Sequence, residues 1–223
     1  MQQTNVQTRR WWSLILLIAA PALVGAQTPR TDHASKNSSS QDAPLASSGL
    51  YHPISPEQRF HWFVHSTVGP QTLGVGVLSA AWGTAFNRPK EYGPHWDGFG
   101  KRYGMRLTGV STGNAMEASL GAIWGEDPRY FRAYDKPFSG RVKSVIAMTF
   151  LAHNREGVRT PAYARYMATA GNNFLSNTWR ADSEATTRAA MLRTLYGFLG
   201  LMAKNAFVEF WPDAKAHLRH HNH

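Results

Sequence analysis

Residues 121–132 read GAIWGEDPRYFR and mark the point where an apolar helical run ends in the middle of the chain. Gly125 follows that run, and glycine is the residue most often found just past a helix C-terminus. Asp127 precedes Pro128, and a capping residue before proline is typical of a helix start. We therefore predict a helix end at Gly125 and a new helical turn with Asp127 as N-cap. Glu126 and Arg129 are then expected to form a structural ion pair at the junction, and the alternative is a catalytic acid with its orienting partner.

The same signal of a helix start recurs on both sides of this junction. Ser55-Pro56 is followed by Gln58, which completes a capping box, and Thr160-Pro161 repeats the cap-proline pair. Asp182-Ser183 precedes the longest apolar stripe of the chain. Together these signals predict helices over residues 56–66, 70–86, 95–124, 138–153, 161–178 and 184–210.

Apolar residues at three- and four-residue spacing predict the buried face of the last helix. They are Leu192, Leu195, Leu199, Met202, Ala206 and Phe210. Glycines and alanines recur at four-residue spacing elsewhere, which allows close helix packing, although Gly93, Gly98 and Gly100 are expected in loops. Alternation with a period of two is scarce. We predict an all-α, single-domain bundle of about six helices with small-residue packing faces, spanning residues 51–215.

The flanking segments are predicted to lie outside this domain. Residues 1–26 carry Arg9 and Arg10 before a short apolar run and a small-residue site at Val24-Gly25-Ala26, as a signal peptide does. Residues 27–50 hold six serines and almost no bulky apolar groups, which predicts a disordered linker. Residues 216–223 form a histidine-rich tail. Residues 66–87 carry no charge and are long enough for a bilayer, but Pro70 and the glycines favour a buried helix.

Composition narrows the classes of function. The sequence has no cysteine, so disulfides, thiolate metal sites and cysteine nucleophiles are excluded. The net charge is +10, and it falls to +8 when Arg9 and Arg10 are left out. Exported basic proteins meet anionic lipid or acidic polymers. The alternative is that the charge serves solubility alone.

Two groups of residues are weak candidates for chemistry. Glu57, His61 and His65 fall on one helical face and could share a metal ion, although the glutamate of a metalloprotease motif is missing. His95 and Asp97 could combine with the acids Glu126 and Asp127 in a hydrolase-type acid–base site. The chain contains no nucleophile elbow, no phosphate-binding loop and no dinucleotide fingerprint.

Basic residues alternate with aromatic ones in two runs of the sequence. This mixture suits contact with lipid headgroups, and the alternative is a solvated basic face with arginine stems packed over aromatic rings. Expected export argues against nucleic acid as the partner. The residues predicted to contact a membrane or another anion are Lys101, Arg102, Arg106, Arg129, Arg132, Lys136, Arg141 and Lys143.

Three segments resemble those of an uncharacterised family of exported bacterial proteins. Pro89–Gly93 matches its P-x-E-[WY]-G segment, Gly98–Arg102 its G-[FY]-G-x-R segment, and Glu126–Tyr130 its E-D-P-R-Y segment. The resemblance covers most of residues 53–180. It implies export and a shared fold, and it implies no activity.

These observations predict a protein of the bacterial periplasm or cell envelope that needs no cofactor. Its expected role is non-enzymatic: it contacts an anionic envelope surface or an envelope protein through peripheral association. A periplasmic hydrolase built around Glu126 and His95 is the first alternative, and a metal-binding helical protein is the second.

Overall fold

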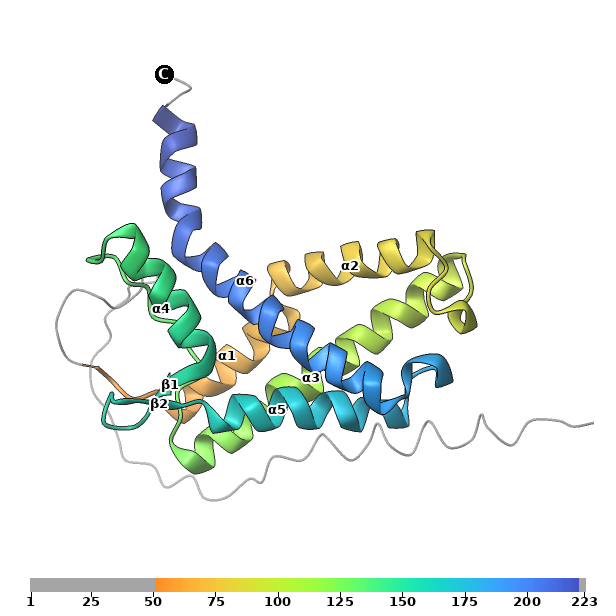
Figure 1. Ribbon diagram of the computed structural model, residues 1–223, viewed down its shortest axis with the longest axis horizontal. Coiled ribbons are helices and arrows are strands. Elements are labelled where there is room, and N and C mark those ends of the chain that lie inside the picture. The colour runs from red at the N-terminus through yellow and green to blue at the C-terminus, as the bar shows by residue number, and fades with distance from the viewer. Residues whose placement is uncertain (1–50, 221–223) are drawn as a thin grey trace, which may run out of the picture. The chain divides into compact units, whose positions relative to one another are not determined.

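The computed structural model describes residues 51–220 and shows a mostly helical protein (Figure 1). The predicted signal peptide, the predicted linker and the last three residues of the tail lie outside the described residues. The α-helices are α1 (Pro56–Val68), α2 (Pro70–Ala85), α3 (Trp96–Trp124), α4 (Phe138–Phe150), α5 (Tyr163–Leu175) and α6 (Thr187–His220). Short 3₁₀ turns are η3 (Lys90–Tyr92), η4 (Ser176–Thr178) and η5 (Asp182–Glu184), and the strands are β1 (Leu151–His153) and β2 (Arg159–Pro161).

Helix α3 is the element around which the others pack. It contacts α1, α2 and α5, whereas α6 contacts α5 and α4 (Figure 1). Small residues set the approach of α3 to α5, because a Cβ atom added to Gly113 would lie 3.0 Å from the Asn172 amide nitrogen. The same Asn172 amide donates a hydrogen bond to the Gly109 carbonyl oxygen at 2.8 Å. Close packing of backbones thus offsets the cost of glycine inside a helix.

The predicted helix boundaries have mixed outcomes. Ser55 is the N-cap of α1, and both hydrogen bonds of the capping box with Gln58 are present. Gly125 ends α3 in the left-handed region with φ of 76°. The predicted cap at Asp127 is wrong, because the chain from residue 126 to residue 137 forms no helix. The predicted cap at Thr160 is also wrong, because that residue lies in β2.

A β-hairpin replaces the predicted helical residues 151–153 and the predicted helix start at 161. Strands β1 and β2 pair antiparallel, with Ala152 opposite Thr160. The Asn154 side chain accepts hydrogen bonds from the backbone of Glu156 and Val158 and holds the turn. Gly157 completes the turn at φ of 78°, a conformation that favours glycine. The hairpin is too short for an alternating pattern to reveal it.

Two further differences concern helix length. Gly98 and Gly100 are helical in α3, not in a loop, whereas Gly93 does lie in the loop before it, at φ of 82°. Helix α6 begins at Thr187 and continues through Pro212 to residue 220. Figure 1 shows α6 changing direction in its C-terminal part, which agrees with the bend that an internal proline introduces.

The distribution of polar and apolar residues reverses the prediction for α6. Leu192, Leu195 and Leu199 are exposed, while Asn205 and Glu209 are buried. The same reversal holds elsewhere, since the fully or nearly fully buried side chains are mainly alanine, serine, threonine and charged residues. Within residues 51–220, no helix combines the length and apolar character needed to cross a bilayer.

Loss of the confirmed N-cap gives a first test of the fold. We expect Ser55→Ala to lower the free energy of unfolding by about 1 kcal/mol, because the Gln58 N–H loses its acceptor. Urea denaturation followed by circular dichroism measures the change. The control is Ser139→Ala, at an exposed position in the first turn of α4, and equal losses in the two variants would contradict the capping role.

Candidate functional site

Glu126 lies directly after α3 and caps the N-terminus of α5. Its two carboxylate oxygens accept hydrogen bonds from the backbone N–H groups of Tyr163, at 3.1 Å, and Ala164, at 3.0 Å. Helix α5 has no side-chain cap from its own N-cap residue, Ala162. A carboxylate at this position satisfies unpaired donors and complements the helix dipole. Burial nevertheless raises the pKa of Glu126, and the two backbone hydrogen bonds work in the opposite direction.

Asp127 is fully buried and binds Arg129. The Arg129 guanidinium donates to Asp127 Oδ2 at 2.6 Å, and the Arg129 backbone N–H donates to Asp127 Oδ1 at 3.0 Å. The Tyr51 hydroxyl also donates to Asp127 Oδ2, at 3.1 Å. Burial, together with the neighbouring carboxylate of Asp127, raises the pKa of Tyr51. The Asp127 carboxylate is thus occupied by the Arg129 guanidinium, the Tyr51 hydroxyl and the backbone N–H of Arg129.

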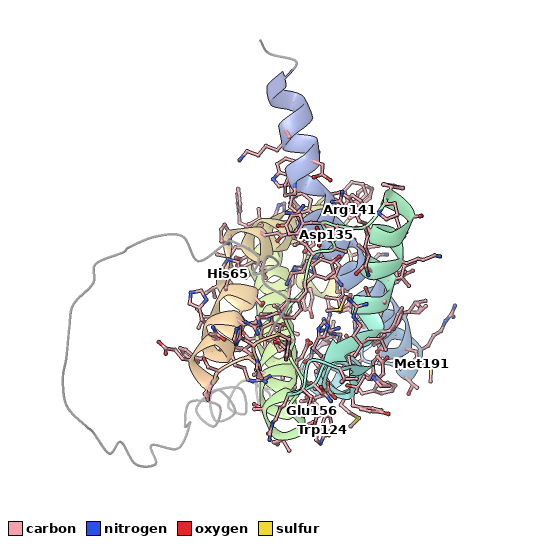
Figure 2. All side chains as sticks on the ribbon, turned by 90° about the vertical axis from the view of Figure 1, so that its left-hand side faces the viewer. His65, Trp124, Asp135, Arg141, Glu156 and Met191 are labelled. Carbon is pink, nitrogen blue, oxygen red and sulfur yellow. The ribbon has the colours of Figure 1, made fainter. Side chains whose placement is uncertain are left out.

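The partners within GAIWGEDPRYFR therefore differ from the predicted ones. The expected ion pair joined Glu126 and Arg129, but the structure pairs Arg129 with Asp127. Glu126 instead binds the N-terminus of α5, which lies much later in the sequence. Asp127 also forms a β-bridge to His153, with its N–H donating to the His153 carbonyl at 2.9 Å. In the hairpin turn, Arg155 Nη2 donates to the Ala122 carbonyl oxygen at the end of α3, at 3.4 Å; Figure 2 labels the neighbouring residues Trp124 and Glu156. The segment ties the end of α3 to the hairpin and to α5.

Arg59 on α1 completes this junction from the other side. Its guanidinium donates to the Glu126 carbonyl oxygen at 2.8 Å. A Cβ atom added to Gly121 would lie 2.7 Å from Arg59 Nη1, so glycine at 121 makes room for the guanidinium. Burial lowers the pKa of Arg59, with the opposing charge of Asp127 as the next largest influence. Helices α1, α3 and α5 therefore meet at the backbone and side chain of Glu126.

A third buried carboxylate, Glu209 on α6, organises the segment before α4. Arg141 Nε donates to Glu209 Oε1 at 2.7 Å, and the Tyr130 hydroxyl donates to Glu209 Oε2 at 2.9 Å. Arg132 donates to the Glu209 carbonyl oxygen at 2.9 Å, and Arg141 also binds Asp213. Burial and the Glu209 carboxylate raise the pKa of Tyr130. This cluster holds α4 against α6 (Figure 2).

A third charged pair lies between α3 and α5. Arg165 donates from Nε to Glu117 Oε1 at 2.9 Å and from Nη1 to the Met148 carbonyl at 2.7 Å. Arg165 is 4% exposed. Nearby, the Asn205 amide donates to the Thr149 hydroxyl at 3.2 Å. The buried charge of Arg165 and the buried amide of Asn205 therefore both have partners, as buried polar groups require.

Sequence reasoning missed these internal partners. It did not single out Glu117, Arg165, Asn205 or Glu209, which form the interior. A signal was present for Glu209, because it is a lone acid in the otherwise apolar stretch 206–211. A carboxylate in such a stretch lies either on the exposed side of the helix or on the buried side with a partner, and the apolar pattern does not distinguish the two.

The candidate hydrolase residues do not come together. His95 stands just before the first residue of α3, and Glu126 follows its last turn. With a rise of 1.5 Å per residue, a helix of this length separates them by about 40 Å. His95 and Asp97 are exposed, and Asp97 binds Lys101 at 2.6 Å. The two pairs of residues therefore cannot act on one substrate.

The candidate metal residues lie on the exposed face of α1. Glu57, His61 and His65 are all exposed, and the rings of His61 and His65 stack with centroids 6.4 Å apart. Figure 2 shows His65 projecting away from the neighbouring helices. Among the side chains that the structure describes, no three histidines, aspartates or glutamates are grouped closely enough to hold a metal ion.

The predicted basic surface separates into three groups. The guanidinium groups of Arg129, Arg132 and Arg141 form the internal ion pairs and backbone contacts described above, so they stabilise the fold. Lys101, Lys136 and Lys143 are exposed. Arg102 and Arg106 project from α3 toward α2 and line a cavity there.

Comparison with known proteins assigns no family to this arrangement. The chain matches no family model, no curated protein and no solved structure at a significant level. The resemblance based on Pro89–Gly93, Gly98–Arg102 and Glu126–Tyr130 therefore stays a prediction.

Removal of the Glu126 carboxylate tests its role as the cap of α5. We expect Glu126→Ala to lower the free energy of unfolding by about 1–3 kcal/mol, because two N–H groups lose their acceptor in a buried place. Thermal and urea unfolding measure the loss. Glu156→Ala, at an exposed position in the hairpin turn, is the control; a loss of equal size there would argue against the cap.

Protonation of His153 should make stability depend on pH. Burial and the charge of Arg159 lower the pKa of His153, whose ring packs against Tyr51 and Phe131. Because the unfolded chain then binds the proton more tightly, this contribution to stability is present above about pH 6.5 and is lost as the pH falls. We expect unfolding free energies measured from pH 7.5 to 5.5 to fall less steeply in His153→Phe, which keeps a ring without a titrating group. An unchanged slope would contradict the assignment.

Proposed function

We propose that this protein is a non-enzymatic component of a bacterial cell envelope that binds peripherally to an anionic membrane surface. The observation that carries the proposal is the apolar stripe of α2, defined as Val75, Leu78, Trp82 and Phe86. All four side chains are exposed, with Leu78 at 72% and Trp82 at 70%. Exposed apolar patches of this kind mark sites of interaction with a partner or a lipid surface.

The charge around the stripe favours lipid over another apolar protein face. No charged residue occurs from residue 66 to residue 87, and Arg88 and Lys90 follow immediately. An apolar helix face with cations at its border suits insertion into the headgroup region of an anionic leaflet. The positive net charge of the chain acts in the same direction.

A second exposed face supports surface binding by α1. Phe60, Val64 and Val68 recur at four-residue spacing and are exposed. Helix α1 leads directly into α2 through Gly69, so the two faces belong to neighbouring helices in contact. These apolar side chains, of a kind that most proteins bury in a core, are therefore free to contact lipid.

The alternatives receive less support from the geometry. The hydrolase needs Glu126 and His95 in one site, and α3 separates them. Metal binding needs a group of ligands that the described side chains do not form. Export to the periplasm or envelope is proposed from the sequence of residues 1–26 alone. The proposal treats residues 51–215 as one helical domain with small-residue packing faces, as the sequence predicts.

Vesicle binding tests the proposal. We expect the full chain to sediment with vesicles of phosphatidylglycerol and phosphatidylethanolamine, and much less with phosphatidylcholine vesicles. Trp82→Glu places a charge in the stripe and should lower the bound fraction at least fivefold without loss of fold, because the side chain is 70% exposed. Ile123→Glu, at a position on α3 that is equally exposed, is the matched control.

Two results would overturn the proposal. One is the absence of binding to anionic vesicles at low salt. The other is an equal loss of binding in Trp82→Glu and Ile123→Glu. Self-association of the chain that Trp82→Glu abolishes, in the absence of vesicle binding, would assign the stripe to a second copy instead.

A further inference from the structure

A cavity of about 250 Å³ lies between α2, the loop that carries η3, α3 and the segment leading into η5. Its volume is far greater than the space that one water molecule needs. The small residues Ser79, Ala80 and Gly83 form its α2 wall. The 3₁₀ segments brace it, because the Ala181 N–H donates to the Tyr92 hydroxyl at 3.2 Å and the Ser183 N–H donates to Glu91 at 3.3 Å.

Four arginines and one glutamate line the cavity: Arg88, Arg102, Arg106, Arg180 and Glu184. The glutamate neutralises one of them, since Arg180 Nη1 binds Glu184 Oε2 at 3.0 Å. Three positive charges therefore remain without an anionic partner among the described residues. A cavity with walls of low dielectric concentrates this field on any ion inside it.

Arg102 is only 7% exposed and has no carboxylate partner among the described residues. Its guanidinium donates to the carbonyl oxygens of Arg88, Pro89 and Gly93 at distances of 2.7–2.9 Å. These acceptors are neutral, so they fix the guanidinium without cancelling its charge. A Cβ atom added to Gly83 would lie 2.9 Å from Arg102 Cδ, which explains a small residue on the facing wall.

Arg106 is the group whose charge and hydrogen-bonding capacity are least satisfied. It forms no ion pair or hydrogen bond with another residue of the described chain, and its Nε is buried without a partner. Burial lowers the pKa of Arg106. A desolvated guanidinium without an anion is costly. Arg59, Arg132 and Arg193 also carry a buried nitrogen without a partner, but each of them donates to an acceptor through another nitrogen. Arg106 is half-buried and has no acceptor among the described residues, so its remaining donors are available to a ligand.

We propose that the cavity binds the phosphate group of an anionic ligand, with Arg106 as the principal contact, Arg88 beside it, and the charge of Arg102 in the adjoining wall. A phosphate monoester carries close to two negative charges, and the phosphodiester of a phospholipid carries one, so both complement the excess of positive charge and both offer several oxygens as acceptors. Guanidinium groups bind phosphate oxygens through paired hydrogen bonds. The pocket is open to solvent along Ser79 and Arg88, and its volume of about 250 Å³ accommodates a headgroup or a small phosphorylated molecule.

The border of the cavity relates it to the α2 stripe. Ser79, Ala80 and Gly83 alternate along α2 with Leu78 and Trp82, so the helix presents one face to the cavity and the adjacent one to solvent. A phospholipid could therefore place its phosphate among the arginines and its chains along the stripe. A free phosphate ester would use the cavity alone, and the site does not depend on membrane binding.

Calorimetry at constant ionic strength tests the site with two probes, inorganic phosphate and soluble dihexanoyl phosphatidylglycerol. We expect saturable one-to-one binding by the full chain. Arg106→Gln should weaken it at least tenfold, and Arg106→Lys should fall between, because lysine keeps the charge but not the paired donors. Lys143→Gln, which removes an exposed charge on α4, is the control and should bind as the unchanged protein does.

Thermal unfolding separates ligand binding from a purely structural role. We expect phosphate to raise the Tm of the unchanged protein and not that of Arg106→Gln, while the ligand-free variant is at least as stable because an unpaired buried charge is gone. Ser79 lies at the exposed rim of the cavity, so Ser79→Trp narrows the cavity. This variant replaces the arginine variants in the test if those unfold. A lipid affinity at least tenfold above that of phosphate assigns the site to a headgroup, and similar affinities assign it to free phosphate esters.

The inference is overturned if neither probe binds, or if Arg106→Gln and Ser79→Trp bind phosphate as Lys143→Gln does. Failure of vesicle binding with intact, Arg106-dependent phosphate binding would remove the proposed membrane role alone. Vesicle binding that is insensitive to Arg106, with no binding of either soluble probe, would remove the cavity site alone.

Discussion

The carboxylate of Glu126 is the constraint on which most of the structure depends. The carboxylate caps α5, and the backbone carbonyl oxygen of the same residue accepts a hydrogen bond from Arg59 on α1. The left-handed turn at Gly125, which ends α3, sets the position of Glu126. Asp127, one residue later, anchors the hairpin and Tyr51. Two adjacent acids thus join three helices and a sheet. Their burial serves the assembly of these elements, which explains why acids in a glycine-flanked sequence need not be catalytic.

The other internal contacts repeat the same principle. Glu209 with Arg141, and Glu117 with Arg165, join pairs of helices through charge and hydrogen bonds, while alanine and glycine let the backbones approach. Many large apolar side chains on α1, α2 and α6 are exposed, although Val145 and Met148 are buried. An interior of this kind supplies directional contacts and little apolar burial. Covering the exposed side chains with lipid or a partner would then add the stabilisation that the interior lacks.

Helices were predictable from local chemistry, and their partners were not. The capping box at Ser55 and the glycine at 125 are complete within a few residues, so the sequence alone locates the start of α1 and the end of α3. The N-cap of α5 comes from Glu126, 37 residues upstream of Tyr163, and no local pattern reveals it. The stripe of α6 showed a helical period correctly but not which face is buried. The arginine cavity likewise joins residues 79–106 to residues 180–184, which only the fold brings together.

The reversed interior has a consequence for how this chain would change over evolutionary time. In most globular proteins, leucines of the core are substituted slowly and charged residues of the surface are substituted readily. Here a paired acid such as Asp127 or Glu209 would change only together with its arginine, whereas Leu195 or Leu199 would tolerate any residue that the outside phase accepts. Divergent descendants would therefore share a sparse set of buried ion pairs and small residues, with little resemblance between their apolar positions.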